Sequence, residues 1–220
     1  MMNSPRSSSR LLRRWRSFRD YAANLGIVGA TRCLIEQRRA ARDGERTGVY
    51  RLRPKSASRP LLIRRRSSDF DVFAQVFLSR HYDSLESTDP REVKLIVDCG
   101  ANAGYSAAFF LSRYPDARVI AVEPESSNVD MLKRNLEPYG DRAQVVHAGV
   151  WSRPAGLAIS EIPYRDGKEW STQVRETRPG EPCDLRGVDI DSLIADSGFD
   201  RISILKMDIE GAEAVVFREN

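Results

Sequence analysis

The residues Asp98-Cys99-Gly100-Ala101-Asn102-Ala103-Gly104 form a short loop signature in a chain of 220 residues. The apolar residues Val93 and Leu95 to Val97 precede the loop, and a helical pattern over 105–114 follows it. In open α/β sheets, ligands bind where a strand ends and the next helix presents free backbone N–H groups. The small residues of this loop therefore predict a ligand site at the end of a buried strand.

The sequence around this loop alternates between apolar strands and amphipathic helices. The predicted strands cover 93–98, 118–123, 143–147, 188–190 and 202–208, and the predicted helices cover 105–114, 127–136, 191–195 and a segment starting near Gly211. Strands that are apolar almost throughout and are separated by helices are typical of a parallel sheet covered on both faces. The predicted fold class is therefore α/β, with a Rossmann-like, mostly parallel sheet between two helical layers.

Composition changes along the chain predict four regions. These are a disordered tail at 1–10, a basic helical extension at 11–57, a lead-in strand and helix at 58–90, and a ligand-binding domain at 91–220 with an insert at 151–186. The extension reads as two amphipathic helices interrupted near Gly26 and Gly29. Ser68 or Asp69 is predicted to cap the helix of the lead-in.

Basic charge is concentrated at the N-terminal end. Residues 1–66 contain 17 Arg and one Lys against four acids, or 18 − 4 = +14, so the remaining residues carry +4 − 14 = −10. Such a cluster can bind nucleic acid or anionic lipid, and an Arg-rich, acid-poor start also fits a transit peptide. However, Arg outnumbers Lys by 30 to 5 in the whole chain. The excess of Arg is therefore a general feature of residue usage, and much of the N-terminal basic charge is expected to lie on ordinary solvated faces. We expect no nucleic-acid partner.

Other compositional features exclude several classes of protein. No apolar run approaches the roughly 20 residues that a membrane span requires. The three cysteines form no CxxC pair and the chain has only two histidines, which argues against a disulfide framework and a zinc site. We therefore expect a cytoplasmic protein with reduced thiols, no transmembrane segment and no predicted metal ligands.

The loop and the next strand together favour S-adenosylmethionine as the ligand. Glu123 ends the strand after the loop, where a carboxylate can accept hydrogen bonds from ribose hydroxyls. A dinucleotide fingerprint needs a second glycine two residues after Gly100, and Asn102 occupies that position. A side chain there obstructs a pyrophosphate, whereas S-adenosylmethionine has none and carries an ammonium that suits Asp98. A nucleotide-dependent oxidoreductase is the weaker alternative.

A second acidic cluster, Lys206-Met207-Asp208-Ile209-Glu210-Gly211-Ala212-Glu213, follows the last predicted strand. Asp208 is predicted to reach the same crevice, where it could orient a substrate hydroxyl, take up its proton or bind a divalent metal. For Glu210, a catalytic role and a structural role as an acid at a helix N-terminus are equally compatible with the sequence. His147 and Cys99 are expected to be structural.

Three segments together resemble the FkbM family of S-adenosylmethionine-dependent methyltransferases. They are residues 96–104, residues 119–124 and residues 206–213. The resemblance implies a class I methyltransferase fold and O-methylation of a sugar, polyketide or similar small metabolite. It also implies cofactor contacts from Asp98, Gly100, Asn102, Gly104 and Glu123.

The resemblance carries one further expectation. The sheet of this family continues past the Asp-Ile-Glu-Gly strand, so a chain that ends at Asn220 is expected to be truncated. A truncated, non-catalytic remnant and a basic binding module therefore remain alternatives to an enzyme. The acceptor, a metal requirement and the oligomeric state are left open by the sequence.

Overall fold

The computed structural model describes residues 6–42, 48–159, 173–209 and 211–218. Backbone contacts divide the chain into two compact units, Met1–His81 and Tyr82–Asn220. This division cuts through the predicted lead-in at 58–90, because its strand pairs with a strand of the extension. That the ligand-binding domain begins at residue 91 stays a prediction.

The first unit begins with α1, Arg6–Arg42, which is broken at Gly26 by a backbone φ of 71°. The two predicted helices are confirmed, with the break at Gly26 alone, since Gly29 lies within the second helical segment. Residues 6–10, assigned above to a disordered tail, are helical because no proline or glycine interrupts the sequence before Gly26. Residues 1–5 lie outside the described ranges.

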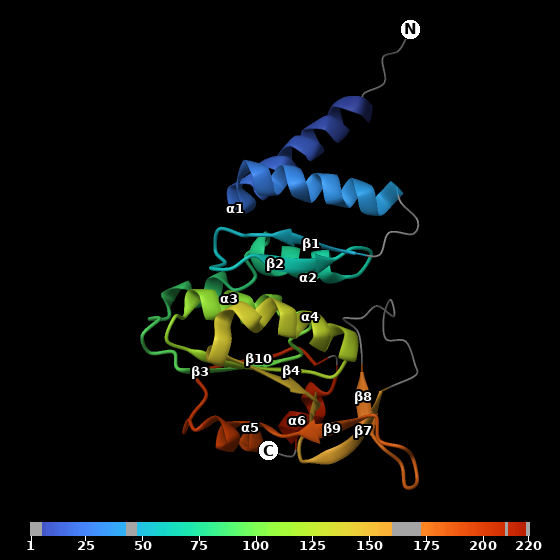
Figure 1. The fold of residues 1–220 in the computed structure, drawn as a ribbon, viewed down its shortest axis with the longest axis vertical. Helices are drawn as coiled ribbons and strands as arrows, with labels where there is room; N and C mark the ends of the chain where they lie inside the picture. The colour runs from blue at the N-terminus through green and yellow to red at the C-terminus, as the bar shows by residue number, and fades with distance from the viewer. Residues whose placement is uncertain (1–5, 43–47, 160–172, 210, 219–220) are drawn as a thin grey trace. The chain divides into compact units, whose positions relative to one another are not determined.

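Two strands and a helix complete the first unit (Figure 1). Strand β1, Val49–Leu52, pairs antiparallel with β2, Leu61–Arg64, and α2 follows at Asp69–Phe77. The predicted cap is wrong in its chemistry: Ser68 is the N-cap residue but makes no side-chain cap hydrogen bond. Asp69 is instead buried and paired with Arg64 at 2.6 Å, because a buried carboxylate needs a charged partner.

The second unit contains the predicted parallel sheet. Its strands are β3 (Leu95–Cys99), β4 (Arg118–Glu123), β5 (Ala143–His147) and β10 (Ile204–Met207), in the order β10-β3-β4-β5. All three pairings are parallel. Short 3-10 helices lie at Asp83–Ser87 and Glu137–Arg142. The α/β fold with a mostly parallel sheet is therefore confirmed.

Helices cover both faces of this sheet, as predicted (Figure 1). They are α3 (Tyr105–Arg113) and α4 (Ser126–Leu136) on one face, and α5 (Ile190–Ser197) and α6 (Glu213–Arg218) on the other. Alternate β3 residues, such as Val97 and Cys99, share a buried cluster with Leu193 of α5 and Val216 of α6. The intervening residue Asp98 therefore points toward α3, which places its carboxylate at the loop.

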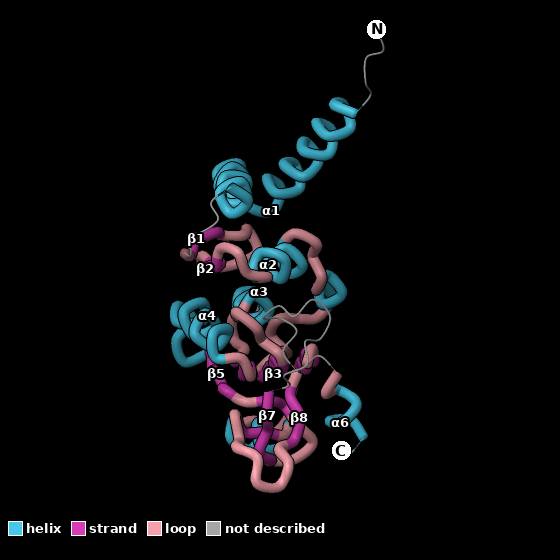
Figure 2. Tube along the Cα trace, turned by 90° about the vertical axis from the view of Figure 1, so that its right-hand side faces the viewer, coloured by secondary structure: helices cyan, strands magenta, loops and turns pink. Residues whose placement is uncertain are grey.

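A second, smaller sheet is built from the predicted insert and the residues on either side of it. Its strands are β6 (Gly149–Val150), β7 (Ala155–Ile159), β8 (Val174–Glu176) and β9 (Leu185–Val188), in the order β6-β9-β7-β8. Strands β7 and β8 form an antiparallel pair and lie side by side in Figure 2. The strand predicted at 188–190 lies earlier, because residues 185–187 pair with β7.

Every helix in the described ranges is too short or too polar to cross a membrane.

Candidate functional site

The carboxylate of Asp98 lies at the carboxyl end of β3 and is fully buried. One oxygen, Oδ2, accepts a hydrogen bond of 2.5 Å from Ser106 Oγ at the start of α3. The other, Oδ1, lies 3.1 Å from Lys206 Nζ, within ion-pair distance, yet their geometry does not make a hydrogen bond. Within the described part of the chain, Asp98 Oδ1 is the buried side-chain oxygen that lacks a hydrogen bond.

Lys206 joins the end of β10 to the loop after β3. Its Nζ donates to the carbonyl oxygens of Gly100 at 2.6 Å and Cys99 at 3.3 Å, and lies 3.9 Å from Asp208 Oδ2. Burial lowers the pKa of this ammonium, but the charges of Asp98, Tyr82 and Asp208 outweigh it, so the net shift is upward. Lys206 is therefore a buried cation at the site. The sequence pattern contains Lys206 in the second acidic cluster but does not predict a role for it.

All five backbone N–H groups from Gly100 to Gly104 donate to oxygens of the protein itself. The acceptors are Val122 O for Gly100 and Ala101, Glu123 Oε2 for Asn102, Asn102 Oδ1 for Ala103 and Ala101 O for Gly104. Asn102 adopts a φ of 51°, which its side-chain bond to the next residue supports. The loop is thus held by internal bonds, and its N–H groups are already used.

Glu123 is buried at the end of β4 and organises the turns around it. Its Oε2 accepts from Asn102 N at 2.8 Å, and its Oε1 accepts from Glu125 N and Asn128 Nδ2, both at 3.1 Å. Burial raises the pKa of Glu123, and these three hydrogen bonds oppose that shift. A carboxylate has about four acceptor positions, so roughly one remains for a ligand. Asn128, which sequence reasoning missed, fixes this carboxylate.

The two glycines of the loop have structural reasons to be glycine. Gly100 has a φ of 74°, and a Cβ there would overlap the carbonyl oxygen of Asp208. Gly104 has a φ of 90°, and a Cβ there would lie 2.8 Å from Leu132 Cδ1 of α4. The space that the sequence assigned to a ligand is therefore filled partly by the chain itself. Their predicted cofactor contacts stay predictions.

The segment after β10 lies next to the loop, as the sequence predicted for Asp208. The Asp208 N–H donates to Cys99 O at 3.1 Å, and its side chain is 68% exposed. Glu210 lies outside the described residues. Glu213, at the start of α6, accepts from Ile209 N at 3.1 Å and from Gly211 N at 2.7 Å, so it satisfies N–H groups before the helix. Asp208 is left as the exposed carboxylate beside the buried Asp98.

Tyr82 brings an aromatic ring to the same group of side chains. Its ring lies 5.4 Å from that of Phe109 and 5.0 Å from that of Phe110. Burial raises the pKa of its hydroxyl to about 12, and Asp98 and Lys206 also act on it. Sequence reasoning missed Tyr82 because it precedes the predicted domain and belongs to no motif.

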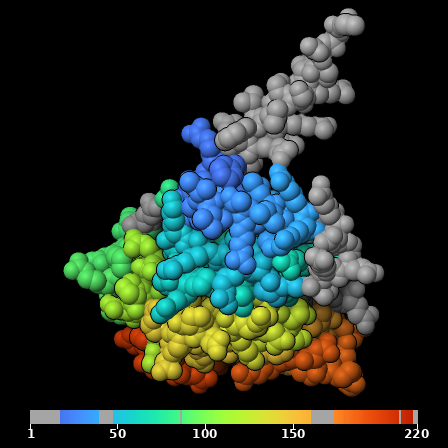
Figure 3. Space-filling view, turned by 45° about the horizontal axis from the view of Figure 1, so that its top comes forward, coloured from blue at the N-terminus to red at the C-terminus, as the bar shows by residue number. Residues whose placement is uncertain are grey.

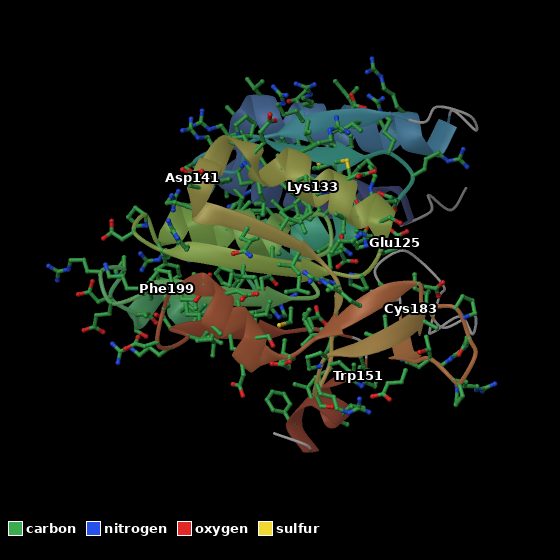
Figure 4. The ribbon with its side chains drawn as sticks, turned by 60° about the horizontal axis from the view of Figure 1, so that its bottom comes forward. Glu125, Lys133, Asp141, Trp151, Cys183 and Phe199 are labelled. Carbon is green, nitrogen blue, oxygen red and sulfur yellow. The ribbon has the colours of Figure 1, made fainter. Side chains whose placement is uncertain are left out.

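His147, Cys99 and Trp151 have structural roles. His147 Nε2 lies 3.0 Å from Pro124 O, and Cys99 is packed in the sheet core, where burial raises its pKa to about 12. Trp151 is buried and its Nε1 donates to Glu176 Oε1 at 2.6 Å, which anchors the small sheet that Figure 4 shows with Trp151 and Cys183 labelled. Tyr164 and Trp170 lie outside the described residues.

The metal-binding side chains and the thiols complete the description of the site. In residues 6–42, 48–159, 173–209 and 211–218, no group of three His, Cys, Asp or Glu residues is placed to hold a metal ion. Cys33, Cys99 and Cys183 are all free thiols.

The chain is similar to several curated methyltransferases. The relatives include Methyltransferase sdnD of Sordaria araneosa, 28% identical, with 67% of each chain covered. Methyltransferase 1 of Beauveria bassiana is 24% identical, covering 67% of this chain and 65% of the relative. The 2-O-methyltransferase NoeI of Sinorhizobium fredii is 26% identical, covering 70% and 65%.

This chain thus spans about two thirds of the length of these curated relatives. The model of the methyltransferase FkbM domain matches residues 98–220, which is more than half of the chain and includes Asp98, the loop, Glu123 and Asp208. The chain therefore belongs to the family of proteins that carry a methyltransferase FkbM domain.

Proposed function

We propose that this protein binds S-adenosylmethionine at the loop 98–104 and transfers a methyl group to a hydroxyl oxygen of a small metabolite. The observation that carries the proposal is Asp98 Oδ1, a buried carboxylate oxygen without a hydrogen bond at the carboxyl end of β3. A buried polar atom in this state needs a donor, and the ammonium of the methionine moiety supplies one.

The surrounding residues fit the rest of that cofactor. Glu123 keeps roughly one acceptor position for a ribose hydroxyl, and the N–H of the loop residue Asn102 donates to Glu123. Gly100 and Gly104 keep the loop tight against β10 and α4. S-adenosylmethionine supplies an electrophilic methyl group, so the protein's own tasks are to position the acceptor and manage its proton.

Asp208 is the residue proposed for the proton. Its carboxylate is exposed and borders the loop, so an acceptor hydroxyl can reach it while the donor site stays buried. Accepting that proton leaves the oxygen more nucleophilic, a contribution typically worth 10²–10⁴ in rate. Glu210 follows in the same segment and remains a second candidate. That one relative is named a 2-O-methyltransferase supports oxygen as the acceptor atom.

A nucleotide-dependent oxidoreductase fits this loop less well than a methyltransferase does. A dinucleotide places its pyrophosphate against N–H groups of this loop and of the next helix. Here the five N–H groups from Gly100 to Gly104 already have protein acceptors. Binding a pyrophosphate would break several of these bonds without a compensating gain.

Calorimetric titration with S-adenosylhomocysteine tests the proposal. We expect saturable binding that Asp98→Asn reduces by at least tenfold, because the charge-assisted bond to the ammonium is lost. Asp196→Asn, at an exposed position of α5, is the control and should bind normally. Circular dichroism verifies that both variants fold. Binding that is unchanged in Asp98→Asn, or tight binding of NAD instead, would contradict the proposal.

A further inference from the structure

The second helical segment of α1, residues 27–42, has an exposed face that combines aliphatic and basic side chains. Ile27, Val28 and Ile35 are 72%, 84% and 42% exposed. The other exposed residues of this face are Thr31, Arg32, Arg38 and Arg39. We call these seven residues the exposed α1 face. The blue atoms of this part of the chain lie at the molecular surface in Figure 3.

The opposite side of the same segment packs against the first unit. Ala30 and Cys33 are fully buried, and Glu36 is buried and paired with Arg65 at 2.6 Å. Glu36 also accepts from Arg39 at 3.3 Å. Because Glu36 points inward, the exposed α1 face contains three aliphatic residues and three arginines without a carboxylate. This orientation is fixed by burial, so the aliphatic residues cannot turn inward without losing the ion pair.

The charge of the whole unit reinforces that of the face. Residues 1–81 contain 19 Arg and Lys against six Asp and Glu, so 19 − 6 = +13. Residues 10–19, which belong to the part of α1 before the break at Gly26, contain five of these arginines. An anionic surface is thus the electrostatically complementary partner.

We propose that the exposed α1 face docks the protein on an anionic lipid surface. A helix that carries aliphatic residues and arginines on one side suits the boundary between lipid headgroups and acyl chains. The aliphatic side chains insert there, and the arginines contact lipid phosphates. Single-stranded nucleic acid is bound by aromatic stacking within a basic groove, and the exposed α1 face offers aliphatic side chains instead. Membrane docking would hold the protein near lipid-associated acceptors. The docking proposal does not depend on methyl transfer.

The test is co-sedimentation of the full chain with vesicles of phosphatidylcholine, alone or mixed with phosphatidylglycerol. We expect binding to the mixed vesicles only, weakening as salt is raised. Arg32→Gln with Arg38→Gln should weaken binding by about fivefold per arginine removed. Ile27→Ser with Val28→Ser should weaken it by at least tenfold, because two aliphatic side chains no longer insert.

Matched controls separate this face from general effects. Arg186→Gln with Arg201→Gln removes the same charge from exposed positions of the second unit, and Ile159→Ser removes an aliphatic residue that is 38% exposed on β7. Both controls should bind like the unmodified chain. Equal binding to neutral vesicles, or equal loss in the controls, would overturn the proposal. So would tighter binding to a single-stranded RNA that the Ile27 and Val28 changes leave intact.

Discussion

Lys206 Nζ lies 3.1 Å from Asp98 Oδ1, so the last strand of the parallel sheet supplies the counter-ion for the buried carboxylate of the central strand. Because Asp98 is fully buried, its charge needs a nearby cation. Lys206 provides that cation while directing its hydrogen bonds to Gly100 and Cys99. Lys206 is thus the counter-ion of Asp98, while Oδ1 makes no hydrogen bond within the described residues.

The first prediction concerns this pair. Lys206→Met should lower the free energy of unfolding by about 3–5 kcal/mol, because it leaves a buried carboxylate uncompensated. The double variant Lys206→Met with Asp98→Asn should cost clearly less than the sum of the single variants. Urea unfolding of the four proteins measures this coupling. Strict additivity would show that the two side chains do not stabilise each other.

A second prediction separates close contact from backbone strain at Gly100. Gly100→Ala should destabilise the protein by roughly 2–5 kcal/mol, since the new methyl group meets the Asp208 carbonyl and the residue keeps a positive φ. Gly198→Ala, at the end of α5, has a φ of 76° with open space around it and should cost only about 1–2 kcal/mol. Thermal unfolding of both variants compares them. Equal losses would mean that the loop does not pack tightly against the segment after β10.

A third prediction follows from Glu123. Its pKa is raised by burial, so between its ordinary value of 4.5 and the higher folded value the native state binds more protons than the unfolded state. The contribution of Glu123 to the free energy of unfolding therefore decreases as pH rises through that window, and stays reduced above it. Glu123→Gln should remove this pH dependence.

Glu123→Gln also mismatches hydrogen bonds, because its NH2 group replaces one carboxylate oxygen and then faces either the Asn102 N–H or the donors of Glu125 and Asn128. Each unsatisfied buried donor costs about 1–3 kcal/mol, so the variant should be less stable near neutral pH. Urea unfolding from acidic to neutral pH measures both effects. Glu137→Gln, at an exposed position after α4, is the control and should leave the pH profile as it is. A profile of Glu123→Gln parallel to that of the unmodified protein would contradict this account.

A fourth prediction concerns Asp208. Asp208→Asn should leave binding of S-adenosylhomocysteine within about twofold, because the side chain is exposed and makes only a distant contact with Lys206. Transfer of tritium from labelled S-adenosylmethionine to hydroxylated metabolites should fall by about 10²–10⁴. The readout therefore separates donor binding from proton uptake. Loss of donor binding with unchanged transfer per bound donor would assign Asp208 to the cofactor instead.

Local patterns in the sequence predicted the elements that hold the site, because hydrophobic period and turn residues act over a few positions. The strand before Asp98, the strand ending at Glu123 and the break at Gly26 are all such local features. Prediction failed where a distant partner decides the outcome. Residues 185–188 join the small sheet because β7, about 30 residues earlier, lies beside them.

The sequence by itself determined the order of strands and helices and the chemical identity of the loop, including Asn102 in place of a glycine. The tertiary structure alone decided what each group faces. It placed Lys206 against a carbonyl 106 residues earlier and gave every N–H from Gly100 to Gly104 an internal acceptor. It also left Asp98 Oδ1, an acceptor, without a hydrogen bond. The physical reason is that burial and hydrogen-bond satisfaction depend on neighbours brought together by the sheet, and sequence spacing does not contain them.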